Sequence, residues 1–278
     1  MGPCLAVDIG GTKAAAAIVT HDGEVLHRDQ VPTGADDDPF ERIADLVRRV
    51  QGDAEVCGIA TAGPMTERGE RLSPVNLPAW RDFPLRARLA EVTGLPTFLD
   101  GDAKALALAE GRFGAAHGVD DYLAMVVSTG VGGGIVLGGE LLDGATGNAG
   151  HIGHIVVEPD GRTCGCGGIG CVEAEASGRA IAEVTGRPPA DAPLDVRRRT
   201  GTLVGRAVAS VANLLDLRLA VVSGSVALGY GDDFFGPAQD ELDRRCRISF
   251  ARGARIIPSP LRDGPLLGAA CVGWRGVR

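Results

Sequence analysis

The residues best suited to chemistry gather in one short segment of the chain. From position 150 to 173 the sequence reads GHIGHIVVEPDGRTCGCGGIGCVE, with three of the seven cysteines and two of the five histidines. Thiolates and an imidazole at short spacing suit a tetrahedral zinc ion, and four of them favour a closed structural site over a catalytic one. The four candidate ligands are His154, Cys164, Cys166 and Cys171. His151 competes for the ligand role, and free thiols without metal are the weaker alternative.

Two glycine-rich loops predict contacts with phosphate groups. The first loop reads DIGGTK from position 8, and the second reads STGVGGG from position 128. Glycines let backbone N–H groups approach phosphate oxygens, and a threonine hydroxyl adds a donor. A tight turn is the alternative for one loop alone, whereas two such loops favour phosphate clamping. The clamping residues that we expect are Gly10, Gly11, Thr12, Lys13, Thr129, Gly130, Gly132, Gly133 and Gly134.

Three aspartates are candidates for the chemistry of phosphate transfer. Asp8 ends a predicted strand at the first glycine loop, where its carboxylate could hold Mg²⁺ through water. Asp100 and Asp102 flank Gly101 at the start of a predicted helix. An aspartate there can cap the helix, or it can accept a hydroxyl proton during phosphoryl transfer. The spacing alone leaves both alternatives open.

The composition argues against several classes of function. The net charge of −8 and the pI of about 5.2 argue against binding to a nucleic-acid backbone. No apolar run approaches the roughly 18 residues that span a membrane. The chain passes from MGPC directly into a strand-like LAVDIGG. We therefore expect no signal peptide, no partner of nucleic acid or membrane, and a cytoplasmic location.

Hydrophobic periodicity predicts an α/β protein that repeats one structural plan. Residues 5–19 and 123–139 each read as a strand, a glycine-rich turn and a second strand, which suggests two related halves. Strands that alternate with helices indicate sheets covered on both faces. Further strands are predicted at 56–63, 95–100 and 219–224, and helices at 40–51, 84–94, 103–114, 173–185, 201–216 and 265–274.

In this order the motifs resemble the ROK family of sugar kinases and sugar-responsive repressors. The matching segments are DIGGTK, GIATAGP, the helix that begins at Asp102, STGVGGGI, GHIGHIVVEPDGRTCGCGGIGCVEA and VVSGSV. The family implies an actin-like (ribonuclease H-like) ATPase fold with a structural zinc and two α/β lobes around an ATP cleft. We expect an N-terminal lobe at 1–115, a larger lobe at 116–264, and a closing helix at 265–278 that returns to the first lobe.

The resemblance also implies roles for single residues. Asp102 matches the catalytic base that takes the proton from the sugar hydroxyl attacking the γ-phosphate. The two glycine loops and Asp8 would hold ATP and Mg²⁺, and Gly224 would lie beside the adenosine. The cluster of three cysteines and a histidine matches the family's zinc site, and the family implies a homodimer. The residues expected at the sugar are Gly63, Asn76, Asp102, His151, His154 and Glu173.

The resemblance implies an ATP-dependent enzyme rather than a repressor. Repressors of the family carry a helix-turn-helix ahead of the first glycine loop, and Asp8 lies eight residues from the start of this chain. A kinase and a sugar sensor without turnover are the remaining alternatives. Asp102 and both phosphate loops favour the kinase.

The nature of the sugar is predicted from the residues around His151. AGHIGH, GIATAG and GCVEAEASGRAIA are similar to motifs of the family's bacterial N-acetylmannosamine kinases, whereas most glucokinases have Glu in place of His151. An imidazole can bind sugar hydroxyls or an N-acetyl carbonyl. We predict an N-acetylmannosamine kinase that forms the 6-phosphate. A glucokinase, or another hexose or N-acetylglucosamine kinase, is the alternative, because Gly101 replaces a substrate-binding Asn and Lys104 is unusual at its position.

Overall fold

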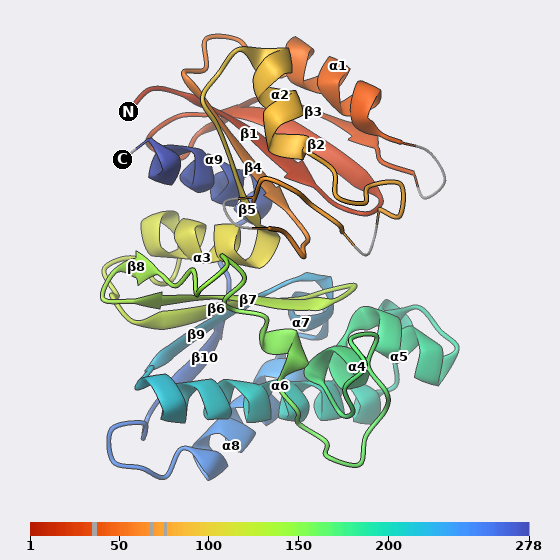
Figure 1. The fold of residues 1–278 in the computed structure, drawn as a ribbon. Helices are drawn as coiled ribbons and strands as arrows, with labels where there is room; N and C mark the ends of the chain where they lie inside the picture. The colour runs from red at the N-terminus through yellow and green to blue at the C-terminus, as the bar shows by residue number, and fades with distance from the viewer. Residues whose placement is uncertain (35–37, 67–68, 75–76, 278) are drawn as a thin grey trace. The chain divides into compact units, whose positions relative to one another are not determined.

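The structure is a computed structural model that describes residues 1–34, 38–66, 69–74 and 77–277 (Figure 1). Contacts between Cα atoms divide the chain into two compact units. Unit 1 comprises Met1–Ala109, Asp143–Ala149 and Leu261–Arg278, and unit 2 comprises Glu110–Leu142 and Gly150–Pro260. The lobes expected at 1–115 and 116–264 stay a prediction, because a division by contacts does not test how the chain folds into domains.

Unit 1 is built on a five-stranded sheet with the order β3-β2-β1-β4-β5. The strands are β1 (Cys4–Ile9), β2 (Lys13–Val19), β3 (Val25–Pro32), β4 (Val56–Thr61) and β5 (Thr97–Gly101). The first three form an antiparallel meander, whereas β4 and β5 continue the sheet parallel to β1. The carboxyl ends of β1, β4 and β5 therefore lie at the same edge of the sheet, where open α/β sheets bind ligands.

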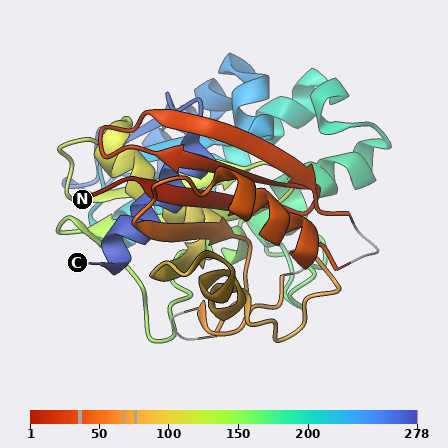
Figure 2. The same cartoon turned by 90° about the horizontal axis from the view of Figure 1, so that it is seen from above.

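Helices pack on this sheet, which Figure 2 shows from above. The helices α1 (Phe40–Val50) and α2 (Leu85–Thr93) contact each other, and α9 (Gly264–Gly276) packs against β1, β4 and β5. Every residue of β4 is buried, as expected for a strand covered on both faces. The helix predicted at 40–51 is confirmed as α1. The apolar residues whose helical spacing predicted it are all buried: Phe40, Ile43, Leu46, Val47 and Val50.

The sheet of unit 2 repeats the plan of unit 1. Its order is β10-β9-β6-β7-β8. The strands are β6 (Tyr122–Val127), β7 (Val131–Leu137), β8 (Glu140–Leu141), β9 (Leu219–Ser223) and β10 (Arg255–Pro258). An antiparallel meander runs from β6 to β8, and β9 and β10 extend the sheet in parallel on the other side of β6. Because β6 takes the place that β1 has in unit 1, the predicted repeat of two related halves is confirmed.

Two long helices, α6 (Leu194–Leu215) and α8 (Asp232–Arg245), pack together in unit 2. Glycine allows their close approach, because a Cβ at Gly205 would lie 2.3 Å from the carbonyl oxygen of Ala238. Helix α3 (Asp102–Phe113) continues from unit 1 into unit 2. The shorter helices of unit 2 are α4 (Val172–Ala176), α5 (Gly178–Thr185), α7 (Ser225–Tyr230), and the 3₁₀ turns η2 (Ile152–His154) and η3 (Pro189–Asp191).

The prediction of one helix at 173–185 is wrong, because the segment forms two helices. The chain leaves the helical conformation at Ser177, between α4 and α5. The hydroxyl of Ser177 accepts a hydrogen bond of 3.1 Å from the N–H of Ala180 and so caps α5. The break directs α5 away from α4, which brings the first residues of α5 to the second glycine loop.

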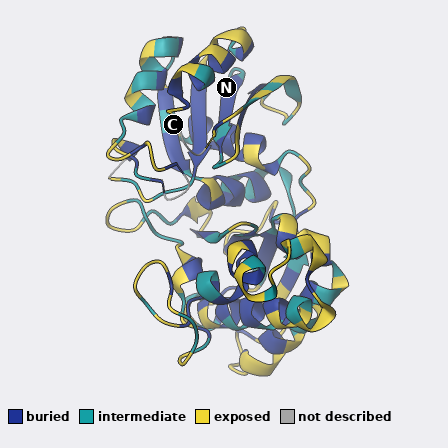
Figure 3. Ribbon diagram, turned by 90° about the vertical axis from the view of Figure 1, so that its right-hand side faces the viewer, coloured by how far each residue is buried: buried dark blue, intermediate teal, exposed yellow. Residues whose placement is uncertain are grey.

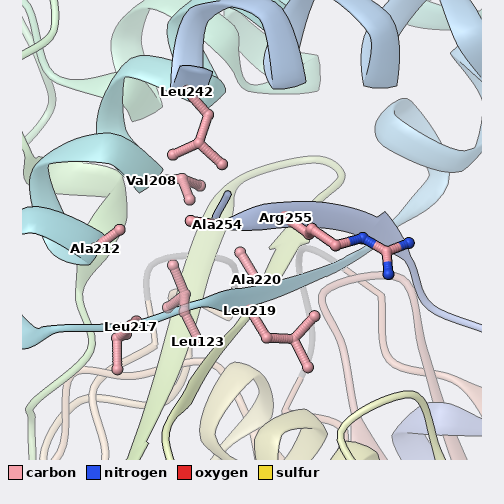
Figure 4. Close-up of a pocket in the computed structure, with 9 residues that line it drawn as sticks. All are labelled: Leu123, Val208, Ala212, Leu217, Leu219, Ala220, Leu242, Ala254 and Arg255. Atoms are coloured by element: carbon pink, nitrogen blue, oxygen red, sulfur yellow. The ribbon is translucent and has the colours of Figure 1, made fainter. Parts of the chain in front are cut away.

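Each unit has its own apolar core (Figure 3). In unit 2, a crevice between α6, α8 and the sheet is too narrow for a water molecule (Figure 4). Its lining residues are Leu123, Val208, Ala212, Leu217, Leu219, Ala220, Leu242, Ala254 and Arg255. This crevice is part of the packing and offers no site for chemistry. Within the described ranges, no helix is both long and apolar enough to cross a membrane.

Candidate active site and metal centre

Asp8 and Asp102 form a pair of carboxylates at the strand ends of unit 1. Asp8 is the second-last residue of β1, just before the glycine loop. Asp102 begins α3 directly after β5. Burial, and then the charge of Asp102, raise the pKa of Asp8 from 3.8 to about 7, against the opposing charges of Lys13 and Arg28. Two carboxylates in such surroundings favour a shared proton or a bound cation. The pair therefore suits both a Mg²⁺ site and a proton acceptor.

Asp102 also has a local structural role. Its Oδ1 accepts a hydrogen bond of 2.8 Å from the N–H of Ala103, at the start of α3. A carboxylate has two oxygens, so holding the helix end does not prevent it from accepting a proton. The two alternatives that the sequence leaves open for Asp102 are compatible with each other.

The first glycine loop is a tight turn whose carbonyl groups are bound by the protein. Thr33 binds two of them: its hydroxyl donates to the carbonyl of Gly10 at 3.0 Å, and its N–H donates to that of Thr12 at 3.1 Å. Among the described residues, the N–H groups of Gly11 and Thr12 donate to no protein acceptor. A turn with occupied acceptors and available donors suits an anion.

The second glycine loop has the same arrangement in unit 2. The carbonyls of Ser128 and Thr129 accept hydrogen bonds of 2.7 and 3.1 Å from the N–H groups of Gly178 and Arg179, at the start of α5. In the described part of the chain, the N–H groups of Thr129 and Gly130 have no protein acceptor. Both loops thus offer backbone donors, as the sequence analysis expects of a phosphate site.

The later glycines of the second loop lie within β7 and serve packing. A Cβ at Gly133 would lie 2.7 Å from the Ile152 side chain, and one at Gly153 would lie 2.3 Å from the carbonyl oxygen of Val131. Their absence of side chains lets the segment from 150 to 154 lie directly on β7. Gly133 therefore shapes the histidine segment, and phosphate contact by Gly132, Gly133 and Gly134 stays a prediction.

The predicted zinc ligands come together in unit 2. One donor atom from each of His154, Cys164, Cys166 and Cys171 lies within 4.8 Å of all the others. The Cys166 and Cys171 sulfurs are 3.8 Å apart, and the Cys164 sulfur is 3.7 Å from Nδ1 of His154. A tetrahedral zinc with sulfurs at about 2.3 Å places them about 3.8 Å from each other. The donor set and its spacing fit a structural zinc ion.

The thiols of this cluster need a cation to ionise together. Burial raises the pKa of Cys171 to about 12, whereas a hydrogen bond from the Gly168 backbone lowers the pKa of Cys166. Zinc binds thiolates and neutral imidazole, so a bound ion would remove the repulsion between neighbouring sulfurs.

The hairpin that carries the cysteines is anchored to α6 through Glu175. This buried carboxylate accepts hydrogen bonds from the Arg162 N–H at 2.6 Å and from the Arg199 guanidinium at 2.7 Å. These charge-assisted contacts hold the pKa of Glu175 below its usual value against the effect of its burial. Gly170 adopts a φ of +72°, and a Cβ there would collide with the carbonyl of Glu158. The hairpin is thus held by the Glu175 hydrogen bonds and by the close packing of Gly170 on Glu158.

Glu173 links the cysteine segment to the second glycine loop. Its Oε2 accepts a hydrogen bond of 2.5 Å from the N–H of Val131. Burial raises the pKa of Glu173, although this hydrogen bond and the charges of Arg179 and His154 oppose the shift. The His151 and His154 rings lie 6.1 Å apart on an exposed surface. His154 faces the cysteines, which leaves His151 as the histidine outside the ligand cluster.

A charge network around Lys104 was not expected from the sequence. The buried Lys104 Nζ lies 3.0 Å from Asp100 Oδ1 and 2.8 Å from Asp143 Oδ1, and it donates to the Gly147 carbonyl at 2.9 Å. Arg275 of α9 pairs with Asp143 at 2.7 Å. The network joins β5, α3, α9 and the segment around Asp143 within unit 1. Lys104 therefore has a structural role next to Asp102.

The remaining predicted residues have varied surroundings. Gly224 has a φ of +103°, and a Cβ there would lie 2.3 Å from the Val127 carbonyl oxygen, so only glycine fits. A Cβ at Gly101 would meet nothing within 4 Å. Gly63 follows β4, and Asn76 lies outside the described residues. In unit 1 the structure groups Asp8, the first loop and Asp102, and in unit 2 it groups the second loop, Glu173 and the ligand cluster.

The two related α/β sheets, each with a glycine loop that offers backbone donors, form the fold of actin-like ATPase-type sugar kinases, as solved structures show. The ROK hexokinase from Thermus thermophilus has a TM-score of 0.85 and 33% identity, over 99% of each chain. A ROK family glucokinase from Streptomyces griseus, in complex with glucose and AMPPNP, has a TM-score of 0.85 and 31% identity over 99% of this chain and 100% of its own.

Sequence comparison gives the family. The ROK family model matches residues 4–271, so the chain belongs to the ROK family. An N-acetylmannosamine kinase from Escherichia fergusonii is 41% identical over 82% of this chain and 84% of its own length. A glucokinase from Thermotoga maritima is 33% identical over 96% of both chains. The resemblance found in the sequence motifs is confirmed.

The ligand cluster leads to a prediction about metal content. Purified wild-type protein should contain about one zinc ion per chain, and Cys166→Ala should lose it because three ligands bind zinc more weakly than four. The same variant should unfold at a lower temperature. Elemental analysis and thermal unfolding measure both effects, with Cys246→Ala as a control that removes a thiol outside the cluster. Zinc-free wild-type protein, or full retention of zinc by Cys166→Ala, would contradict the assignment.

The raised pKa of Asp8 leads to a prediction about stability and pH. Because ionisation of Asp8 is disfavoured in the folded state, its contribution to folding is lost as the pH rises from about 4 toward about 7. Asp8→Asn cannot ionise, so without Mg²⁺ its unfolding temperature at pH 8 should exceed that of the wild type. The difference should shrink as the pH falls toward 4.

Thermal unfolding across this pH range tests the prediction for Asp8. Asp22→Asn is a matched control, since the Asp22 side chain is fully exposed. A lower unfolding temperature for Asp8→Asn than for the wild type at pH 8 would show that Asp8 is not disfavoured as an anion.

Proposed function

We propose that this sugar kinase transfers the γ-phosphate of ATP to the 6-hydroxyl of N-acetylmannosamine. The choice of sugar depends on the position of His151. Its imidazole is exposed beside the predicted sugar residue His154, yet it is not among the four clustered ligands. The similarity to N-acetylmannosamine kinases at 40% identity and above supports the same substrate. An imidazole can bind the N-acetyl carbonyl as well as hydroxyl groups.

The proposed base is Asp102. It would accept the proton of the attacking hydroxyl, and its position at the rigid junction of β5 and α3 limits its movement. Asp8 and the donors of the first glycine loop would hold the metal–phosphate end of ATP. Bound Mg²⁺ would supply positive charge that offsets the charge of the phosphate oxygens. The raised pKa of Asp8 fits a carboxylate that receives a cation only with the nucleotide.

In unit 2 the proposed role of zinc is structural. The ion would be held by His154, Cys164, Cys166 and Cys171, and it would fix the start of α4, which carries Glu173. Glu173 in turn orders the second glycine loop through Val131. The zinc site would thus keep sugar-binding and phosphate-binding residues in one geometry without taking part in the chemistry.

A glucokinase activity is the second candidate. The glucokinase from Thermotoga maritima covers nearly the whole chain, and the Streptomyces griseus enzyme was solved with glucose. A sensor without turnover is the third candidate, which the retention of Asp102 opposes. We propose that the enzyme forms a homodimer, as the family resemblance implies, and that it is cytoplasmic, as the sequence analysis expects.

A coupled assay of ADP release tests the proposal. Zinc-loaded protein is supplied with ATP, Mg²⁺ and, in turn, N-acetylmannosamine, N-acetylglucosamine, mannose and glucose. The highest kcat/KM is expected with N-acetylmannosamine, and NMR of the product should show a 6-phosphate. A much higher kcat/KM with glucose would replace the proposal with a glucokinase. Absence of ADP release with all four sugars would favour the sensor.

The role of Asp102 leads to a prediction about turnover. Asp102→Asn keeps the hydrogen-bonding shape but cannot take a proton, so kcat should fall by about 10²–10⁴-fold. Sugar affinity, measured by calorimetry, should stay near the wild-type value. Asp53→Asn, at an exposed position, serves as the control. Turnover near the wild-type rate in Asp102→Asn would exclude this aspartate as the base.

The open space at Gly101 leads to a prediction about affinity. A Cβ at Gly101 would meet nothing within 4 Å, and the resemblance implies that an asparagine there would donate to the sugar. Gly101→Asn should therefore raise kcat/KM by about 2- to 12-fold, the equivalent of one hydrogen bond of about 0.5–1.5 kcal/mol. Gly101→Ala, which adds no donor, should leave kcat/KM unchanged. A loss in Gly101→Asn for every sugar would show that the substrate already occupies this space.

A further inference from the structure

Arg179 is an exposed cation beside the second glycine loop, and the mechanism above gives it no role. It is the second residue of α5, and its N–H donates to the carbonyl of Thr129 at 3.1 Å. Within the residues that the structure describes, its guanidinium forms no hydrogen bond or ion pair. Its planar guanidinium carries five donors in a fork that matches the geometry of phosphate.

The loop next to Arg179 lacks acceptors that would bind its guanidinium. The carbonyls of Ser128 and Thr129 are occupied by α5, whereas the N–H groups of Thr129 and Gly130 have no acceptor in the described chain. The Glu173 carboxylate lies beside Gly130 and binds the N–H of Val131, but the two preceding N–H groups of the loop remain available as donors next to a positive charge. Such a surface attracts an anionic ligand with several oxygens.

The acidic groups near Arg179 do not satisfy its charge. Glu173 is close enough for the charge of Arg179 to lower its pKa, but its carboxylate is bound to the N–H of Val131 and forms no ion pair with Arg179. Glu183 lies one turn further along α5 and does not pair with it either.

We propose that Arg179 contacts the phosphate chain of ATP and stabilises its charge during transfer. The proposal rests on the assignment of the second glycine loop to phosphate. Arginine binds phosphate through two parallel N–H donors, and donors fixed near a transferring phosphoryl group stabilise its transition state. The loop would supply neutral donors, and Arg179 would supply the charge that they lack.

Equilibrium binding to the zinc-loaded protein separates phosphate contact from other roles. Arg179→Ala should weaken binding of the ATP analogue AMP-PNP by about tenfold or more, as expected for a charge-assisted hydrogen bond. Adenosine, which has no phosphate, should bind within about twofold of the wild type by the same measure. Arg179→Lys should restore part of the loss. Arg187→Ala is the matched control, an exposed arginine just beyond the end of α5.

Each outcome bears on Arg179 in a defined way. AMP-PNP binding equal to that of Arg187→Ala would overturn the proposal. An equal loss of AMP-PNP and adenosine affinity, or a lowered unfolding temperature, would show a structural role and overturn it as well. Turnover of a sugar other than N-acetylmannosamine by the wild type would change the proposed function but leave the binding test of Arg179 intact. A wild type that binds no AMP-PNP would overturn both.

Discussion

The proximity of two carboxylates at one edge of the unit 1 sheet is the constraint on which the account depends. Three parallel strands end there, so the chain brings Asp8 and Asp102 together from positions far apart in the sequence. Burial and mutual repulsion raise the pKa of Asp8 to about 7. A fold that retains such a pair gives up stability at neutral pH unless a cation or a proton joins it. In a phosphoryl-transfer site, a metal ion would supply the cation and the substrate hydroxyl would supply the proton.

Unit 2 offers backbone N–H groups in place of carboxylates at the corresponding part of its sheet. Its sheet has the same strand plan as unit 1, and its glycine loop occupies the same place between the first two strands. In both loops the carbonyl groups are bound by neighbouring residues, and backbone N–H groups are left as donors. Unit 2 adds a ligand cluster whose hairpin reaches this loop through Glu173 and Val131. The proposed zinc site and the proposed phosphate loop are thus connected through one hydrogen bond.

The sequence predicts those features that depend on local pattern. The period of apolar residues places α1, glycine runs mark both loops, and close spacing brings three of the four metal ligands together. Short-range signals do not reveal the ion pair between Lys104 and Asp143, because the two residues are 39 positions apart. The edge strand β3 is also missed, since its run of His27, Arg28, Asp29 and Gln30 lacks an apolar alternation. The helix break at Ser177 depends on one serine hydroxyl inside a helical pattern.

A direct test of the central claim is an NMR titration of the Asp8 carboxyl group. The resonance is assigned by its loss in Asp8→Asn and followed with pH in zinc-loaded protein without Mg²⁺. The account predicts a pKa of about 7 for Asp8 in the wild type. In Asp102→Asn the pKa should be lower than in the wild type but still raised, because the neighbouring charge is gone while the burial of Asp8 remains. A pKa near 4 that is the same in both proteins (about the ordinary aspartate value) would contradict the account.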